Sequence, residues 1–431
     1  MPYLDRSSLT RLSFAFDGRG ARVSQCTLFP LDRLSQWRVS VLLLRNARPS
    51  RVLSDGNTIS ERFMRLLPSL TRIKAGLVLL LMLSGTITAS AQPASPSSAP
   101  DPKLIGETIE RAKGLSNLRS LIVSHDGTIL AEQAVGGARI DRPANIKSAS
   151  KTVMSALVGI AIERGVLAGV DQPIASLLGS NIPSDADPRI RQVTIGHLLS
   201  MQAGLERTSG RNYGAWTGSG NWVRYVLSRP FVDEPGGRML YSTGSTHLLS
   251  AALTRASKRS TLELARDWLG EPLGIDVAPW TRDPQGIYLG GNEMALSPRA
   301  LWRFGEMYRQ GGTMDGKRIV SENWIRESWT PRTSSPFTGD AYGYGWFIRE
   351  MRGHKAYYAW GFGGQMLYVI PSLGLTVVMT SNPTEPSRED NYVGQLHSLV
   401  ADGIVPALLQ KRNESAGSLG ANDQKPSERP L

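Results

Sequence analysis

Cysteine is nearly absent from this 431-residue chain, which has only Cys26, and histidine is scarce. A single cysteine cannot close an internal disulfide or supply the paired thiolates of a structural metal site. The histidines show no metal-ligand spacing; they are His125, His197, His247, His354 and His397. His197 and His247 lie in apolar segments, where a packed, hydrogen-bonded histidine is the expected role. The sequence therefore predicts no metal centre.

Two common hydrolase signatures and a nucleotide-binding loop are also missing. The chain has no G-x-S-x-G nucleophile elbow and no H-E-x-x-H zinc helix. The stretch from Gly311 to Lys317 imitates a P-loop, but Arg318 replaces the Ser or Thr that the loop requires. The segment before it also has the periodicity of a helix rather than a strand, and Asp315-Gly316 favours a turn. We expect neither a metal nor an organic cofactor.

The positive charge of the chain is concentrated near its N-terminus. The formal net charge is +12, and residues 1–91 contribute +8 of it, from thirteen Lys or Arg and five Asp or Glu. The +4 left for residues 92–431 is modest, and no basic stripe interleaved with aromatic residues runs through them. Nucleic acid is therefore not an expected partner.

Residues 64–91 have the three-part layout of a secretory signal peptide. A basic start and an A-x-A-like cleavage site at Ala89–Ala91 flank an apolar core, Ala75–Leu83, that is short for a membrane span. We expect a periplasmic or secreted protein. The alternative is an uncleaved signal anchor, which would be the only contact with a membrane.

Met64 is the expected start of the protein. Residues 1–63 hold ten arginines and no lysine, and they have no sustained period of 2 or 3.6. We interpret them as a mis-assigned or disordered N-terminal extension. Because Cys26 lies in that extension, the exported protein would contain no cysteine and no thiol nucleophile.

One folded unit, residues 103–411, is expected between a Pro/Ser-rich linker at 92–102 and a polar tail at 412–431 that we expect to be disordered. Its first segment has helical spacing, followed by two β-rich runs around Asp126-Gly127, a hairpin signal. Further β-rich runs lie near the C-terminus, before a closing helix that is expected to start at Ser387.

The middle of this unit, residues 150–310, is mostly helical in pattern. The predicted fold class is therefore α+β. Its first and last segments would share one antiparallel sheet flanked by helices, with a mainly helical subdomain inserted between them.

Ser148 and Lys151 lie three apart at the head of the apolar run "KSASKTVMSALVG". Residues at this spacing share one face of a helix, and a serine in the first turn lies near unpaired N–H groups. The run is apolar on nearly every side, so the helix is buried and its lysine is partly desolvated, which lowers the lysine pKa. The alternative is that Ser148 only caps the helix and Lys151 extends to solvent.

The order of several segments adds specificity: "KSASKTVMSALVG", "VTIGHLLSMQAGL", "EPGGRMLYSTGSTHLLSAAL", "ALSPRALWRFGEMYRQGG" and "WGFGGQMLYVIP". This order resembles the serine β-lactamase-like hydrolase superfamily over essentially all of residues 103–411. The match looks closest to the class C β-lactamase-related branch, which includes 6-aminohexanoate-dimer hydrolases and type VIII-like esterases. The resemblance implies a β-lactamase/transpeptidase-like fold.

The resemblance also implies roles for three catalytic residues. Ser148 would be the acylated nucleophile, and Tyr241 of "YST" would transfer protons together with Lys151. We expect a cationic lysine nearby to lower the pKa of the Tyr241 phenol. Thr243 stands where β-lactamases have Asn, so it keeps a hydrogen-bonding group but loses the amide.

The third motif of the superfamily, Lys-Thr-Gly in β-lactamases, aligns here with "WGFG". The resemblance assigns Trp360 and Gly361 to this edge strand and the N–H of Gly363 to the oxyanion hole, together with the N–H of Ser148. No lysine or histidine is present in the stretch. The cation that would hold a β-lactam or peptide carboxylate is therefore missing, which argues against an efficient β-lactamase or carboxypeptidase.

A Gly-rich aromatic stretch at 210–222 lies within the helical middle of the chain. Its large side chains are Tyr213, Trp216 and Trp222. They either line the mouth of a substrate pocket or pin the loop to the body of the protein. The sequence leaves both roles open.

We therefore predict an exported serine hydrolase that cleaves an ester or amide bond of a small molecule through an acyl-enzyme on Ser148. A β-lactamase or D-amino-acid peptidase acting on cell-wall peptides is an alternative of the same class. A binding protein on the same fold, without catalysis, is an alternative of another class. The oligomeric state does not follow from the sequence.

Overall fold

The computed structural model describes residues 99–386 and 391–409, which all belong to the compact unit Gln92–Leu431. Several predictions fall outside the described residues: the extension 1–63, the signal peptide 64–91, most of the linker 92–102, the tail 412–431 and the helix start at Ser387. Within the described part of the chain, no helix combines the length and the apolar character that a membrane span requires.

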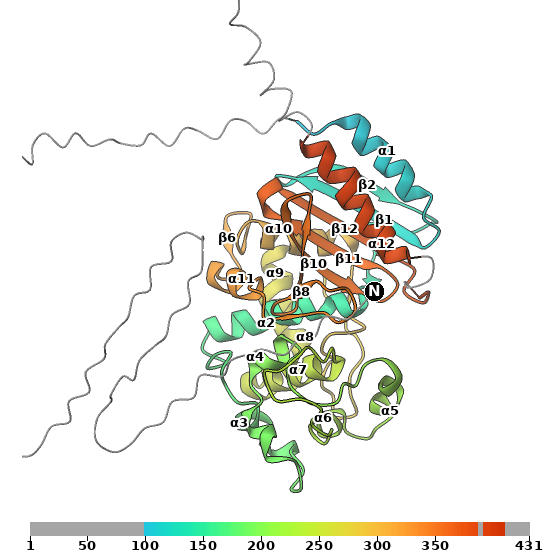
Figure 1. Cartoon of the computed structure of the whole chain (residues 1–431). Coiled ribbons are helices and arrows are strands. Elements are labelled where there is room, and N and C mark those ends of the chain that lie inside the picture. Colours follow the sequence, from blue (N-terminus) through green and yellow to red (C-terminus); the bar gives the residue numbers. More distant parts are fainter. Residues whose placement is uncertain (1–98, 387–390, 410–431) are drawn as a thin grey trace, which may run out of the picture. The chain divides into compact units, whose positions relative to one another are not determined.

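An eight-stranded antiparallel sheet is the centre of the unit, with the strand order β2-β1-β12-β11-β10-β9-β8-β7 (Figure 1). Its strands are β1 Leu118–His125, β2 Thr128–Ala134, β7 Thr333–Ser334, β8 Ala341–Tyr342, β9 Phe347–Met351, β10 His354–Gly361, β11 Gln365–Ile370 and β12 Leu375–Ser381. Because β1 pairs with β12, the first and last segments share one sheet, as predicted.

Two short antiparallel strand pairs are separate from this sheet. β3 (Ala144–Asn145) pairs with β4 (Ala295–Leu296), and β5 (Thr313–Met314) pairs with β6 (Lys317–Arg318). The predicted turn at Asp315-Gly316 joins β5 to β6, so the P-loop-like stretch is a hairpin. The predicted turn at Asp126-Gly127 joins β1 to β2 in the same way.

Successive side chains of the central strands point to opposite faces of the sheet and pack into two separate hydrophobic cores. Along β1, Leu121 and Val123 pack into one core and Ile122 into the other. The first core lies under helices α1 (Pro102–Lys113) and α12 (Tyr392–Ser398) and the π-helical turn Leu399–Ile404 that follows α12. Figure 1 shows α1 and α12 side by side on this face of the sheet.

The second core lies between the sheet and the inserted helical region. It contains α2 (Ser150–Glu163) and α10 (Pro298–Arg309), whose apolar side chains meet Ile122 and Leu367 of the sheet. Nearly every side chain of α2 from Ser150 to Ala161 is buried, as its all-round apolar pattern predicts. This buried helix places the segment before it between the sheet and the helical region (Figure 1).

The helical region and its connections confirm the predicted α+β layout. Its remaining helices are α3 Ala175–Leu178, α4 Ile195–Leu199, α5 Tyr213–Thr217, α6 Trp222–Leu227, α7 Thr243–Ser257, α8 Thr261–Ala265, α9 Glu271–Leu273 and α11 Glu322–Ser328. Short 3-10 turns at Lys147–Ala149, Gly179–Asn181, Pro188–Gln192, Gly210–Asn212 and Pro371–Leu373 and a π-helical turn at Arg266–Gly270 complete the helical elements of the described residues.

Candidate active site

Ser148 lies in the 3-10 turn Lys147–Ala149, directly before α2. The cap position of α2 is Ala149, which makes no side-chain hydrogen bond to the helix. Ser148 is therefore not the helix cap that the alternative interpretation required. It is half-buried and lines a pocket.

The amino group of Lys151 points to Ser148 and does not reach solvent. Lys151 is only 2% exposed, and its Nζ lies 3.1 Å from Ser148 Oγ. Nζ also donates to the carbonyl of Gly291 at 2.7 Å and lies 3.2 Å from Thr243 Oγ1. A neutral amine has two N–H groups and one lone pair, so it can donate to Gly291 and Thr243 and accept the Ser148 proton.

Burial moves the pKa values of Lys151 and Tyr241 in opposite directions. It lowers the pKa of Lys151 to about 7, as predicted. It raises the pKa of Tyr241 to about 12, although a hydrogen bond with Ser148 acts in the opposite direction. The predicted lowering of the Tyr241 pKa is therefore wrong, because desolvation of the phenolate outweighs the stabilisation available around it.

Thr243 begins α7 and connects Lys151 to a second hydroxyl. Its Oγ1 lies 3.1 Å from Ser209 Oγ, which in turn accepts the N–H of Thr243 at 2.8 Å. The hydroxyl at this position thus gives Lys151 a partner that is itself held in place. The sequence did not indicate Ser209, since it belongs to a loop without a recognised spacing.

The end of β10 lies against the turn that carries the nucleophile. A Cβ on Gly361 would lie 2.2 Å from the carbonyl oxygen of Ile146 and 3.1 Å from Lys147 Cβ, so only glycine fits there. Trp360 and Phe362 line the pocket, and Phe362 is 49% exposed. Gly363 is instead buried in the β10–β11 turn, where a Cβ would lie 2.4 Å from the carbonyl of Asn382.

The aromatic stretch 210–222 divides between the two roles that the sequence left open. Tyr213 lines the pocket, and its hydroxyl accepts a hydrogen bond from Asn292 Nδ2 at 2.9 Å. Trp216 is fully buried and donates to the carbonyl of Trp222. The pocket-lining role therefore does not hold for Trp216, because its ring packs between Tyr213, Trp222 and His247 and anchors the loop.

A loop at residues 290–293, which no motif indicated, contacts several parts of the site. The carbonyl of Gly291 accepts from Lys151, and a Cβ on Gly291 would lie 2.8 Å from Lys151 Cγ. Asn292 holds Tyr213, and Glu293 forms an ion pair with Lys147 at 3.0 Å. Only the polar pair Asn292-Glu293, between Gly-Gly and an apolar run, could have drawn attention in the sequence.

His247 anchors the start of the same loop. Its Nε2 lies 3.1 Å from Asp283 Oδ2, and both side chains are fully shielded from solvent. Its Nδ1 accepts the N–H of Gly290 at 3.4 Å. Both ring nitrogens therefore have structural partners, which confirms the expected packed role of His247 and leaves neither of them to activate Ser148.

The pocket in front of Ser148 has a volume of about 530 Å³. Its lining combines catalytic candidates, aromatic rings and a few charges: Lys147, Ser148, Arg207, Ser209, Gly210, Tyr213, Tyr241, Thr243, Asn292, Glu293, Phe337, Phe347, Trp360, Phe362 and Pro386. The Arg207 guanidinium lies 5.6 Å from the Phe337 ring centroid, and Lys147 is neutralised by Glu293. Among residues 99–386 and 391–409, no three His, Cys, Asp or Glu side chains gather closely enough to bind a metal ion.

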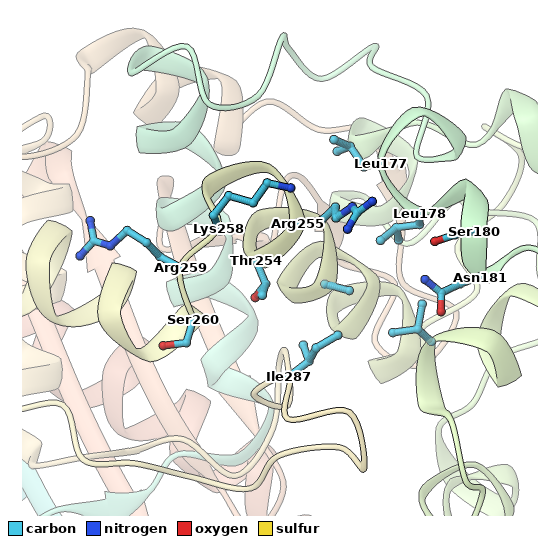
Figure 2. A pocket seen from close by; sticks show the side chains of 12 residues that line it. Leu177, Leu178, Ser180, Asn181, Thr254, Arg255, Lys258, Arg259, Ser260 and Ile287 are labelled. Atoms are coloured by element: carbon cyan, nitrogen blue, oxygen red, sulfur yellow. The ribbon is translucent and has the colours of Figure 1, made fainter.

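A second pocket, of about 390 Å³, lies at the C-terminal end of α7 (Figure 2). Its lining includes Arg255, Lys258 and Arg259, and Figure 2 shows Arg259 pointing away from Leu177 and Leu178. Arg259 instead pairs with Asp267. Cations at this end of a helix compensate the helix dipole, and Ser260 of the lining is the N-cap of α8, where its hydroxyl is bonded to Glu263 and not to a lysine. The chemistry of a nucleophile and its base is therefore found only in the first of these two pockets.

The chain is similar in sequence to a family of known proteins and to a named relative. The family model described as Beta-lactamase matches residues 111–402. The chain is 24% identical over 294 residues to a 6-aminohexanoate-dimer hydrolase of Paenarthrobacter ureafaciens, which covers 62% of this chain and 73% of that protein.

Two solved structures are similar in fold. A Bacillus anthracis protein named as a 6-aminohexanoate-dimer hydrolase superposes with a TM-score of 0.59 at 18% identity, over 72% of this chain and 82% of that one. An octameric penicillin-binding protein homologue from Pyrococcus abyssi superposes with a TM-score of 0.55 at 20% identity, over 72% of this chain and 80% of that one. These neighbours confirm the predicted β-lactamase/transpeptidase-like fold.

Proposed function

The chain belongs to the beta-lactamase family and is a serine hydrolase, and we propose that it cleaves an amide or ester bond through an acyl-enzyme on Ser148. One observation carries the proposal: Lys151 Nζ, buried and 3.1 Å from Ser148 Oγ, has a pKa lowered to about 7. A nucleophile needs such a base within hydrogen-bond reach. The finer assignment to the class C-related branch stays a prediction.

Lys151 is the base in this mechanism. Its neutral amine takes the Ser148 proton as the oxygen attacks the substrate carbonyl, while Gly291 and Thr243 hold the amine in place. Tyr241 keeps its own proton at neutral pH, since its pKa is about 12. It passes a proton to the leaving nitrogen or oxygen and is reprotonated by Lys151, and water then releases the acyl group from Ser148.

Backbone N–H groups would stabilise the oxyanion. The N–H of Ser148 is the first donor. For the second, the carbonyl of Gly361 accepts the N–H of Gly364 inside the β10–β11 turn. Alternation along the strand then directs the N–H of Phe362 to the opposite edge, where the pocket lies. This favours Phe362 over the sequence-predicted Gly363 as the second donor.

The pocket lining supports a linear, largely apolar substrate. Phe337, Phe347 and Phe362 provide ring surfaces around Ser148. The curated relative is named for the dimer of 6-aminohexanoate, which is a linear amide. We therefore include linear amides beside simple esters as the proposed substrate class.

Export remains part of the proposal. The signal-peptide layout of residues 64–91 supports a periplasmic or secreted enzyme. N-terminal sequencing of the protein recovered outside the cytoplasm should show that its first residue is the one after Ala91. A sequence that contains residues before Met64 would contradict both the start and the cleavage site.

A second candidate function has one observation in its favour. Arg207 supplies a cation at the pocket even though the "WGFG" stretch lacks one. A carboxylate-bearing substrate, such as a β-lactam or a D-amino-acid peptide, would find a partner there. Hydrolysis of nitrocefin as fast as of simple esters would make this the leading function.

A substrate panel with a covalent probe tests the proposal. Wild type and Ser148→Ala are assayed with p-nitrophenyl esters, short linear amides and nitrocefin, and both are treated with a fluorophosphonate. We expect turnover and a covalent adduct in wild type only. Folded wild type that forms no adduct on Ser148 and turns over nothing would instead support a non-catalytic binding protein on this fold.

A further inference from the structure

The residue before the nucleophile faces a carboxylate across a short antiparallel ladder. In the β3–β4 pair, Ala144 lies opposite Leu296 and Asn145 opposite Ala295. The N–H of Ile146 donates to the carbonyl of Met294 at 2.9 Å, so the register continues beyond the strands. One residue further along this register, Lys147 lies opposite Glu293, and the two form an opposite-charge pair across the ladder.

Glu293 and Lys147 close a ring of hydrogen bonds through Asn145. Lys147 Nζ donates to Glu293 Oε1 at 3.0 Å, and Asn145 Nδ2 donates to Oε2 at 2.6 Å. Asn145 Oδ1 accepts the backbone N–H of Lys147 at 2.9 Å. The ammonium of Lys147 is therefore bonded directly to the carboxylate of Glu293, and its backbone N–H is linked to the same carboxylate through Asn145.

Lys147 needs this restraint because its backbone is left-handed. Its φ is +50°, and that of Glu293 is +60°. Residues with a Cβ adopt this region rarely and at a cost, and such residues concentrate at active sites. The conformation of Lys147 sets the direction in which the chain enters the Ser148 turn.

The same loop also fixes the base. Two residues before Glu293, the carbonyl of Gly291 accepts from Lys151 Nζ. The loop is anchored at Gly290 by the buried His247–Asp283 pair. One end of the loop thus holds Lys151 and the other holds the residue before Ser148.

We propose that Glu293 is a positioning residue of the hydrolase, which acts through Lys147 to hold Ser148 Oγ against Lys151. This inference rests on the proposed function, since it concerns the same nucleophile. It assigns the carboxylate to the protein's own geometry and not to the substrate, although Glu293 lines the pocket. Both carboxylate oxygens already have partners.

A double-mutant cycle between positions 147 and 293 tests this. In the wild-type background, Glu293→Gln should lower kcat for p-nitrophenyl acetate about tenfold with KM nearly unchanged, because a small misplacement of a nucleophile is costly. Glycine adopts a positive φ without strain, so in the Lys147→Gly background the same substitution should cost less than about twofold. The rate of fluorophosphonate labelling of Ser148 should follow kcat.

Asp402→Asn is the matched control. Asp402 pairs with Arg352, another cation with a left-handed backbone (φ +52°), outside the pocket lining. Asp402→Asn should change Tm about as much as Glu293→Gln does, but it should leave kcat unchanged. If Glu293→Gln does not fold, Lys147→Met removes the same ion pair and should cause the same loss.

Three results would overturn the proposal. Equal losses in the wild-type and Lys147→Gly backgrounds would mean that Glu293 acts independently of Lys147. A change in KM that depends on substrate charge would mean that Glu293 binds substrate. An unchanged kcat would remove the role altogether. Failure of the proposed function gives a different pattern, in which wild type itself is neither labelled nor active.

Discussion

The amino group of Lys151 lies over the face of the Tyr241 ring, 5.0 Å from its centroid. The ring offers a cation the negative face of its π system, but burial disfavours the charged forms of both groups. The pKa of Lys151 falls to about 7 and that of Tyr241 rises to about 12. Near neutral pH the pair therefore holds one proton on the phenol and a half-deprotonated amine, which makes Lys151 the base.

The pH dependence of kcat/KM should report Lys151. Its amine accepts the Ser148 proton only when it is deprotonated, so activity should rise with pH through an apparent pKa of about 7 and then level off. Initial rates with p-nitrophenyl acetate between pH 5 and 9 measure this. Tyr241→Phe should lower the plateau and retain the rising limb. If kcat/KM began to rise only near pH 10, this would contradict a desolvated lysine as the base.

Replacement of Lys151 should stabilise the fold while it abolishes activity. The folded-state pKa of about 7 lies below the ordinary value of 10.5, so the unfolded chain takes up a proton that the folded chain does not. The free energy of unfolding therefore decreases, through Lys151, as the pH falls from about 10.5 to about 7. Lys151→Met removes that cost, and we expect about 2 kcal/mol of added stability at pH 7, or about 4 °C in Tm.

Exposed Lys103 provides the control for this prediction. Lys103→Met should change the free energy of unfolding by less than about 0.5 kcal/mol. A Tm of Lys151→Met below that of wild type would mean that the hydrogen bonds to Gly291 and Thr243 outweigh the desolvation of the amine.

The parts of the site that lie close together in the sequence could be predicted from it. Ser148 and Lys151 are three residues apart at the head of an apolar run, a spacing that left both a catalytic pair and a simple helix cap open. The resemblance of the ordered segments to serine β-lactamase-like hydrolases favoured the catalytic pair, and the structure has the contact and the lowered lysine pKa. The strand pattern at both ends of the unit indicated one shared antiparallel sheet, and β1 pairs with β12. These signals are local in the sequence or repeat with a fixed period.

The parts that depend on loops could not be predicted in this way. Ser209 and Glu293 reach the site from irregular segments, and only the tertiary fold brings them to Thr243 and Lys147. The direction of the Tyr241 pKa shift also depends on how completely the fold removes water from the ring. The sequence could not show whether Trp216 lines the pocket or anchors its loop, because an aromatic ring suits both roles; only its complete burial in the structure decides.

Gly361→Ala should remove activity through the backbone of the nucleophilic turn. The new Cβ would lie 2.2 Å from the carbonyl oxygen of Ile146, so the segment that carries Ser148 must move. We expect kcat/KM to fall about a hundredfold, with a loss of stability of about 2 kcal/mol. Gly106→Ala in α1, where a Cβ meets nothing within 4 Å, should be active and slightly more stable. Comparable activity of the two variants would contradict close packing at Gly361.

Arg207 should decide how the enzyme discriminates between neutral and anionic substrates. Its guanidinium lies at the pocket beside the exposed ring of Phe337, while the charge of Lys147 is compensated by Glu293. A pair of linear esters isolates its effect: p-nitrophenyl hexanoate, and the mono-p-nitrophenyl ester of adipic acid, which ends in a carboxylate. Arg207→Gln should lower the adipate-to-hexanoate ratio of kcat/KM about fivefold, as expected for an ion pair near solvent.

Exposed Arg211, which is absent from the pocket lining, is the matched control, and Arg211→Gln should leave the ratio at the wild-type value. Salt should reduce the wild-type preference and have little effect on that of Arg207→Gln, because screening acts only where the charge pair exists. An unchanged ratio in Arg207→Gln would mean that the carboxylate lies elsewhere in the pocket. A ratio that falls equally in Arg211→Gln would assign the preference to the general positive field around the pocket and not to one arginine.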